Sequence, residues 1–152
     1  MKNILFVCTG NTCRSCMAEA IFNHFCDIGG FTAISAGVSV INGSKTSNNA
    51  AKVIKQSLNQ DISNRKAVKI NQSLIENSEI VLTMTLYIKN ILQQKFAKLK
   101  YKIFTLNEYV SIDNDIIDPF GSDIETYTQT YNQLVYSIKV LLQKLKEDTS
   151  IC

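Results

Sequence analysis

Residues 4–15 read Ile-Leu-Phe-Val-Cys-Thr-Gly-Asn-Thr-Cys-Arg-Ser, and the architecture of the chain can be worked out from this run. Four consecutive apolar residues, 4–7, are typical of a strand that is covered on both faces in a parallel sheet. The polar loop 9–14 follows, and Ser15 is suited to cap a helix whose apolar positions recur at helical spacing until the glycine pair 29–30. The run therefore predicts a buried strand, a loop and a helix.

The same alternation continues along the chain. Further strands are predicted over residues 31–35, 80–84 and 102–106, and further helices after Ser47, around residues 88–92 and over residues 123–146. Alternating strands and helices favour an α/β sandwich with a parallel sheet and right-handed crossovers. In such sheets, ligands bind at the carboxyl ends of the strands.

Length and composition limit the classes of protein to consider. The 152 residues are enough for one domain, 1–152, and a hydrophobic content of 45% with 19% charged residues is ordinary for a globular chain. A net charge of +3 without a basic block gives no support for nucleic-acid binding. The start of the chain reads as a strand rather than an export signal or a membrane segment. We therefore expect a cytoplasmic monomer with reduced cysteines and no membrane contact.

The loop after the first predicted strand has the features of an anion site. Successive N–H groups of a tight loop can converge on one point, and the start of the following helix adds partial positive charge. Arg14 supplies a planar fork of donors that suits two phosphoryl oxygens, and the same donors stabilise a thiolate nucleophile at Cys8. Cys8 alone could be a small buried apolar residue. Its spacing to Gly10, Arg14 and Ser15 favours the catalytic interpretation.

These residues resemble the signature of the low-molecular-weight protein tyrosine phosphatase family, which is a Cys, five residues, an Arg and a Ser near the N-terminus. The resemblance extends over nearly the whole chain, through Ser35-Ala36-Gly37, Leu82-Thr83-Met84 and Asp118-Pro119-Phe120-Gly121. It implies a flavodoxin-like three-layer sandwich with a four-stranded parallel sheet and a phosphate loop between the first strand and the first helix. It also implies no metal, no other cofactor, phosphorylated protein substrates and a phosphocysteine intermediate at Cys8.

The resemblance also assigns roles to individual residues. Asn11 and Ser35 would brace the loop, and Asp118 would act as general acid and then as general base. From the residues themselves, Asp118 is a better candidate than Asp113 or Asp115 because it precedes a proline and a Phe-Gly turn, although Asp before Pro is also a common turn former. The residues expected to bind phosphate are Thr9, Gly10, Asn11, Thr12, Cys13, Arg14 and Ser15.

Two positions bear on the substrate. Family members that act on phosphotyrosine generally carry an aliphatic residue at the position of Thr12, and often two aromatic residues after the Asp-Pro pair. Thr12 and Phe120-Gly121 instead resemble the protein-arginine phosphatases of Gram-positive bacteria. A planar, polar guanidinium group suits a hydroxyl and the carboxylate of Asp118. We expect a phosphoarginine substrate, with phosphotyrosine as the open alternative because a loop threonine often serves only local backbone groups.

The cysteines offer a second chemistry. Cys16 stands where the family usually has proline, so that Cys13 and Cys16 have the spacing of a dithiol redox motif at a helix start, as in a thioredoxin-like oxidoreductase. The resemblance instead implies a reversible disulfide between Cys8 and Cys13 that protects the nucleophile. Both interpretations remain open at the level of the sequence.

Two further alternatives use the same loop. Arsenate reduction needs additional cysteines that relay a disulfide, and the chain has none between Cys26 and Cys152. A phosphate-binding module without catalytic activity would not need Cys8, Arg14 and Asp118 together. Both alternatives are therefore less well supported than a cysteine-dependent phosphatase.

Overall fold

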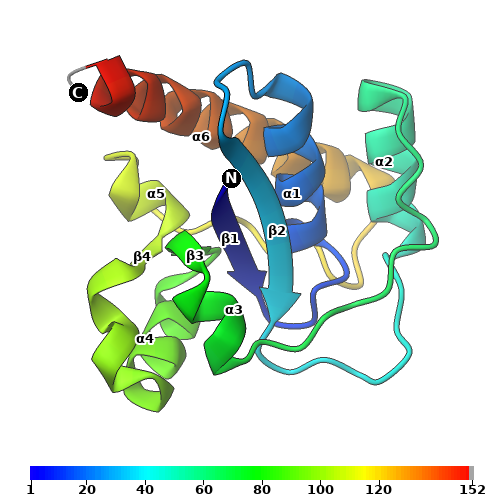
Figure 1. Cartoon of the computed structure of the whole chain (residues 1–152). Helices are drawn as coiled ribbons and strands as arrows, with labels where there is room; N and C mark the ends of the chain where they lie inside the picture. Colours follow the sequence, from blue (N-terminus) through cyan, green and yellow to red (C-terminus); the bar gives the residue numbers. More distant parts are fainter. Residues whose placement is uncertain (151–152) are drawn as a thin grey trace.

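The computed structural model describes residues 1–150, the side chain of residue 150 excepted, and Cys152 lies outside the described residues. A four-stranded sheet forms the middle of the molecule, in the order β2-β1-β3-β4, and all of its strand pairs are parallel (Figure 1). Its strands are β1 (Lys2–Cys8), β2 (Phe31–Gly37), β3 (Ser78–Thr83) and β4 (Ile103–Thr105). Residues 4–8 of β1 are buried, as the apolar run predicts for a central strand.

Seven helical segments surround the sheet. They are α1 (Arg14–Phe25), α2 (Asn48–Leu58), α3 (Gln72–Glu76), α4 (Leu86–Lys95), the 3-10 helix η1 (Ala97–Lys102), α5 (Leu106–Tyr109) and α6 (Ile124–Ser150). Helices α1, α2 and α6 contact one another, while α3, α4 and α5 pack around β3 and β4 (Figure 1). The chain moves from β1 to β2 in one direction and from β3 to β4 in the other, so right-handed crossovers place α1 and α4 on opposite faces. The predicted flavodoxin-like sandwich is confirmed.

The order of the strands also locates the site. The connections from β1 and from β3 leave in opposite directions, and the carboxyl ends of these two neighbouring strands therefore border a crevice. The loop 9–13 lies at this point, between the last residue of β1 and the first turn of α1. Within residues 1–150, no helix has the length and apolar character needed to cross a membrane.

Helix α1 differs from its prediction at both ends. Ser15 is not the N-cap: Cys13 occupies that position without a side-chain capping bond, and Ser15 is buried inside the first turn. The helix ends at Phe25, because Cys26 adopts an extended conformation while its N–H donates to the carbonyl oxygen of Phe22. The chain then turns through the residues before β2, whose first residue pairs with Lys2 at the start of β1.

Candidate active site

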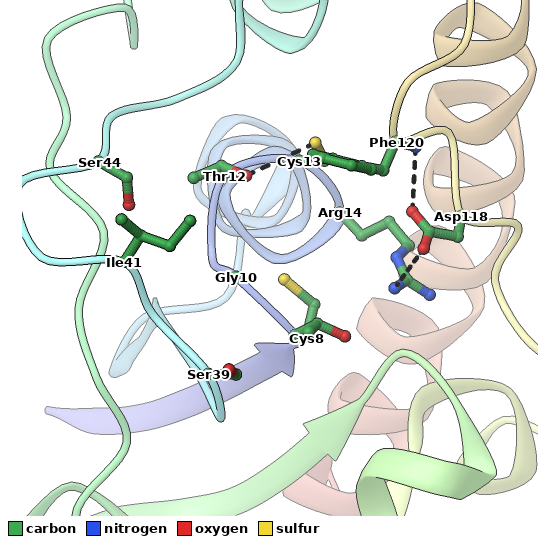
Figure 2. A pocket seen from close by; sticks show the side chains of 11 residues that line it. Cys8, Gly10, Thr12, Cys13, Arg14, Ser39, Ile41, Ser44, Asp118 and Phe120 are labelled. Carbon is green, nitrogen blue, oxygen red and sulfur yellow. Dashed lines mark hydrogen bonds and ion pairs between the residues drawn. The ribbon is translucent and has the colours of Figure 1, made fainter.

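A cavity of about 270 Å³ opens at the carboxyl end of β1 (Figure 2). Most of the residues predicted from the sequence to form the site contribute to its wall. The lining residues are Cys8, Thr9, Gly10, Thr12, Cys13, Arg14, Ser39, Ile41, Ser44, Asp118 and Phe120. The other predicted residues, Asn11, Ser15 and Ser35, are buried beneath the loop and support it from below.

The loop backbone is turned so that its N–H groups face the cavity. The carbonyl oxygens of Cys8, Thr9 and Thr12 accept bonds of 2.9–3.1 Å from the N–H groups of Val38, Ser39 and Ser47 in the segment behind the loop. In a trans peptide the following N–H points the opposite way, and the peptide bonds of the described residues are trans. The N–H groups of residues 9, 10 and 13 therefore point toward the cavity. This arrangement suits a tetrahedral anion.

Cys8 lines the cavity and is buried, with 3% of the residue exposed. Its Sγ lies 2.8 Å from Ser15 Oγ and accepts a hydrogen bond from the N–H of Asn11 at 3.2 Å. Asn11 has a left-handed backbone, with φ of 57°, which turns its N–H toward the sulfur. Ser15, expected from the sequence to cap the helix, instead directs its hydroxyl at Cys8.

Arg14 and Asp118 lie next to each other on one side of the cavity (Figure 2). Arg14 is buried, its Nη1 donates to the carbonyl oxygen of Ile116 at 3.2 Å, and its Nη2 lies 3.5 Å from Asp118 Oδ2. The Asp118 side chain is 57% exposed, and its Oδ1 accepts a hydrogen bond from the N–H of Phe120 at 3.0 Å. The carboxylate therefore stands at the mouth, within reach of the fork of donors that would hold an anion above Cys8.

Two other cysteines lie close to the loop. Cys13 Sγ is 3.2 Å from the hydroxyl of Tyr127, and burial together with this contact raises the pKa of Tyr127 to about 12. Cys16 donates from Sγ to the carbonyl oxygen of Cys13 at 3.2 Å, and burial raises the pKa of the Cys16 thiol. Cys13 lines the cavity and Cys16 does not, so the cavity does not present the two thiols of a dithiol motif together.

Gly37, at the end of β2, leaves the space that the loop needs. A Cβ at this position would lie 2.7 Å from the carbonyl oxygen of Thr9 and 2.9 Å from the N–H nitrogen of Asn11. We expect Gly37→Ala to displace the loop and to weaken binding of inorganic phosphate at least about 10-fold, because each lost N–H bond to an anion costs about 1.5–3 kcal/mol. Isothermal titration with phosphate measures the change. Gly29→Ala, where a Cβ meets nothing within 4 Å, is the matched control, and equal affinities for the two variants would contradict this reasoning.

Seven residues of the site were not found from the sequence: Ser39, Ile41 and Ser44 line the cavity from the segment after β2, and four others support it. Ile116 and Tyr127 contact Arg14 and Cys13 from more than 100 positions away, and the sequence contains no local signal for such pairs. Glu19 and Arg65 form an ion pair of 3.2 Å below the loop. Glu19 follows Ser15 by one helical turn, and this spacing could have placed it on the same face of α1.

Comparisons with known proteins agree with this geometry. The sequence profile described as "Low molecular weight phosphotyrosine protein phosphatase" matches residues 3–151. A protein-arginine-phosphatase of Bacillus subtilis (strain 168) is 37% identical over 150 residues, which cover 96% of this chain and 98% of the relative. The low molecular weight protein-tyrosine-phosphatase PtpB of Staphylococcus haemolyticus is 38% identical over 135 residues, or 89% of this chain and 94% of the relative.

A solved structure has the same fold and a related site. The arginine phosphatase YwlE, in a cysteine-to-serine mutant with a phosphorylated active-site serine, superimposes with a TM-score of 0.89 at 36% identity. The match covers 96% of this chain and 97% of that chain. Because the family profile spans nearly all of the sequence and the relatives match over their full length, the chain belongs to the low molecular weight phosphotyrosine protein phosphatase family and is an enzyme.

Proposed function

We propose that this enzyme is a protein-arginine phosphatase that works through a phosphocysteine at Cys8. The observation that carries the substrate assignment is the lining of the cavity at Thr12. Its hydroxyl-bearing side chain borders the cavity in the same loop as Cys8, where an aliphatic residue would give an apolar wall. A guanidinium group carries N–H donors around its edge and needs acceptors, which Thr12 and the carboxylate of Asp118 supply.

The rest of the wall supports the same substrate. Ser39 contributes a polar side chain to the wall, and among the lining residues Phe120 is the one aromatic side chain. Phe120 is 77% exposed and stands at the rim, so it can cover one side of a flat group. The degree of identity to relatives does not choose between substrates, because relatives with either name match about equally well.

In the first step, the Cys8 thiolate attacks the phosphorus atom. The S–P bond forms and the P–N bond to the arginine breaks, and its electron pair stays on the nitrogen, which takes a proton from Asp118. The N–H groups of the loop and the fork of Arg14 hold the three remaining phosphoryl oxygens and stabilise their charge in the transition state. The phosphorylated serine in the solved relative supports a covalent intermediate of this kind.

In the second step, water replaces the cysteine. Asp118, now ionised, accepts a proton from the water molecule as its oxygen bonds to phosphorus. The S–P bond breaks, its electron pair returns to Cys8, and inorganic phosphate leaves. The Ser15 hydroxyl, 2.8 Å from the sulfur, stabilises the thiolate that is released.

Replacement of Thr12 by isoleucine tests the substrate assignment. We expect Thr12→Ile to lower kcat/KM for phosphoarginine peptides about 10-fold, the size of one hydrogen bond to a charged group, and to raise it for phosphotyrosine peptides. Phosphate release from both peptides, measured for the wild type and for the variant, gives the ratio of kcat/KM for phosphoarginine to kcat/KM for phosphotyrosine. Thr128→Ile, the same change at an exposed position of α6, should leave the ratio unchanged. If Thr12→Ile leaves it unchanged as well, Thr12 does not determine the substrate.

We further propose that the enzyme works as a monomer on phosphorylated proteins in the cytoplasm. The cavity of this one chain already contains the proposed nucleophile Cys8, the anion loop, Arg14 and the proposed acid Asp118, so the proposed reaction does not require a residue from a second copy. Cys8, Cys13, Cys16 and Cys26 are free thiols, which suits a reducing compartment. If peroxide oxidises Cys8 to the sulfenic acid, Cys13 could condense with it, with loss of water, to form the protective disulfide.

A further inference from the structure

The buried side of the phosphate loop is held by a network of side chains in which Arg65 has the largest number of contacts. Arg65 lies in the segment between α2 and α3, which passes the carboxyl ends of β1 and β2 (Figure 1). Backbone bonds anchor the segment, from Thr46 N–H to the carbonyl oxygen of Arg65 and from Gly37 N–H to that of Val68. The Arg65 side chain therefore enters the space beneath the loop from a fixed position.

The Arg65 guanidinium holds three side chains together. Nε and Nη2 donate to the two carboxylate oxygens of Glu19 at 3.3 and 3.2 Å. Nη2 also donates to Ser35 Oγ at 2.6 Å, and Nη1 donates to Asn11 Oδ1 at 3.0 Å. The side chains of Arg65 and Glu19 are 18% and 25% exposed, so the ion pair is partly buried, and both carboxylate oxygens of Glu19 accept from Arg65.

These bonds fix the orientation of the Asn11 amide. Asn11 Oδ1 accepts from Arg65 Nη1 and from the N–H of Val68, and both groups are donors that can meet only the oxygen. The amide nitrogen must then point the other way, where it donates to Ser15 Oγ at 2.7 Å and to Ser35 Oγ at 3.0 Å. The Ser35 hydroxyl in turn donates a hydrogen bond to Glu19 Oε1 at 2.9 Å.

The orientation of the Asn11 amide decides the direction of the hydrogen bond between Ser15 and Cys8. Ser15 Oγ has one hydrogen, and its bond from Asn11 Nδ2 is one in which the oxygen accepts. The Ser15 hydrogen is therefore free to point at Cys8 Sγ, 2.8 Å away, and to stabilise a thiolate. If the Asn11 amide flipped, its oxygen would face Ser15, and the hydrogen would be drawn away from the sulfur.

We propose that Arg65, held by Glu19, is a positioning residue that fixes the direction of the hydrogen bonds beneath the phosphate loop, so that Ser15 donates to the Cys8 sulfur. A guanidinium has only donors and no acceptor, so Arg65 cannot reverse the direction of these bonds. The titratable groups that face Arg65 are the Glu19 carboxyl and the Cys16 thiol, and burial raises the pKa of Cys16, which keeps it neutral. The inference rests on the proposed chemistry of Cys8 but not on phosphoarginine as the substrate.

Arg65→Met tests the proposal, with p-nitrophenyl phosphate as substrate. We expect kcat to fall about 10- to 100-fold with a smaller change in KM, because the sulfur and its donors lose their alignment. A second measurement is the rate of Cys8 alkylation by iodoacetamide as a function of pH, counting only the alkylation that inorganic phosphate prevents. The pH at which this rate is half-maximal should be higher in Arg65→Met than in the wild type. Arg65→Lys should recover part of kcat. In Arg65→His the rate relative to wild type should fall as pH rises through about 6.5, where an imidazole loses its proton.

Lys89→Met is the matched control, because it removes an ion pair of similar burial, Lys89 with Glu108 at 2.8 Å, that does not touch the loop. Both variants should lose thermal stability, and only Arg65→Met should change kcat and the alkylation midpoint. Loss of stability in Arg65→Met with kcat and midpoint unchanged would overturn the proposal. If the wild type fails to hydrolyse p-nitrophenyl phosphate, the proposed function is at fault, and the alkylation midpoint still tests the role of Arg65.

Discussion

Cys8→Ser is expected to abolish turnover of phosphoarginine peptides, with a loss of about 10⁶-fold in kcat, the size found when an enzyme loses its nucleophile. A serine hydroxyl in the same place can attack phosphorus once, slowly, because the loop still holds the phosphoryl group in line. The product is a phosphoserine, in which the serine oxygen is a poor leaving group, so the second step stops. We therefore expect the serine variant to retain one phosphoryl group, which intact-mass spectrometry detects after incubation with substrate.

Cys8→Ala is the control for this experiment. It removes the nucleophilic sulfur and keeps the backbone and Cβ. The variant should therefore be as inactive as Cys8→Ser, and it should still bind inorganic phosphate through the unchanged loop. It cannot hold a phosphoryl group covalently. A phosphoryl adduct on Cys8→Ala, or substantial turnover by either variant, would show that another residue carries the reaction.

Asp118→Asn is expected to lower kcat for phosphoarginine peptides by about 10² to 10⁴-fold, the usual contribution of a general acid and base. Asparagine keeps an oxygen that can accept the N–H of Phe120, so the turn at the rim should be preserved. With p-nitrophenyl phosphate, whose leaving group needs no proton, the first step should stay fast while the second is slow. Stopped-flow measurement should then show a burst of nitrophenol equal to the enzyme concentration.

Asp115→Asn is the matched control. Asp115 lies three positions before Asp118 in the sequence, but its carboxylate accepts a hydrogen bond from the N–H of Leu86 and does not line the cavity. Its replacement should leave kcat unchanged for both substrates. If Asp118→Asn slows peptide and aryl phosphate equally and gives no burst, Asp118 acts on the turn rather than on the proton.

The sequence was sufficient for the sheet and for the main helices. The apolar run 4–7 is followed at once by a polar loop with glycine, which favours a buried strand, and the apolar stripe of α6 recurs over several turns. The segments α3, η1 and α5 were not predicted, since four to six residues are too few to show a period. In the structure, Asn71 accepts from Leu74 N–H, and Thr105 forms a capping box with Glu108, whose Thr-x-x-Glu spacing is already present in the sequence.

The upper side of the site was predictable, and so were Asn11 and Ser35 below the loop, but Glu19 and Arg65 were not. Cys8 to Arg14 are contiguous, and Asp118 lies in a turn with a proline, so local patterns identify them. Arg65 contacts Asn11 across 54 positions, and such a contact depends on where the segment between α2 and α3 passes the sheet. Ser15 was assigned to the helix cap because its type and place fit that role. The hydroxyl is instead held by Asn11 and Cys8, a choice made by tertiary contacts.

Phosphate release from phosphoarginine and phosphotyrosine peptides of one sequence, by the wild-type enzyme under reducing conditions, tests the central claim most directly. The mechanism and the lining of the cavity predict a higher kcat/KM for phosphoarginine, and Cys8→Ala should release phosphate from neither. A preference for phosphotyrosine would contradict the substrate assignment while leaving the chemistry of Cys8, Arg14 and Asp118 in place. Release of phosphate from neither peptide by the wild type would contradict the claim as a whole.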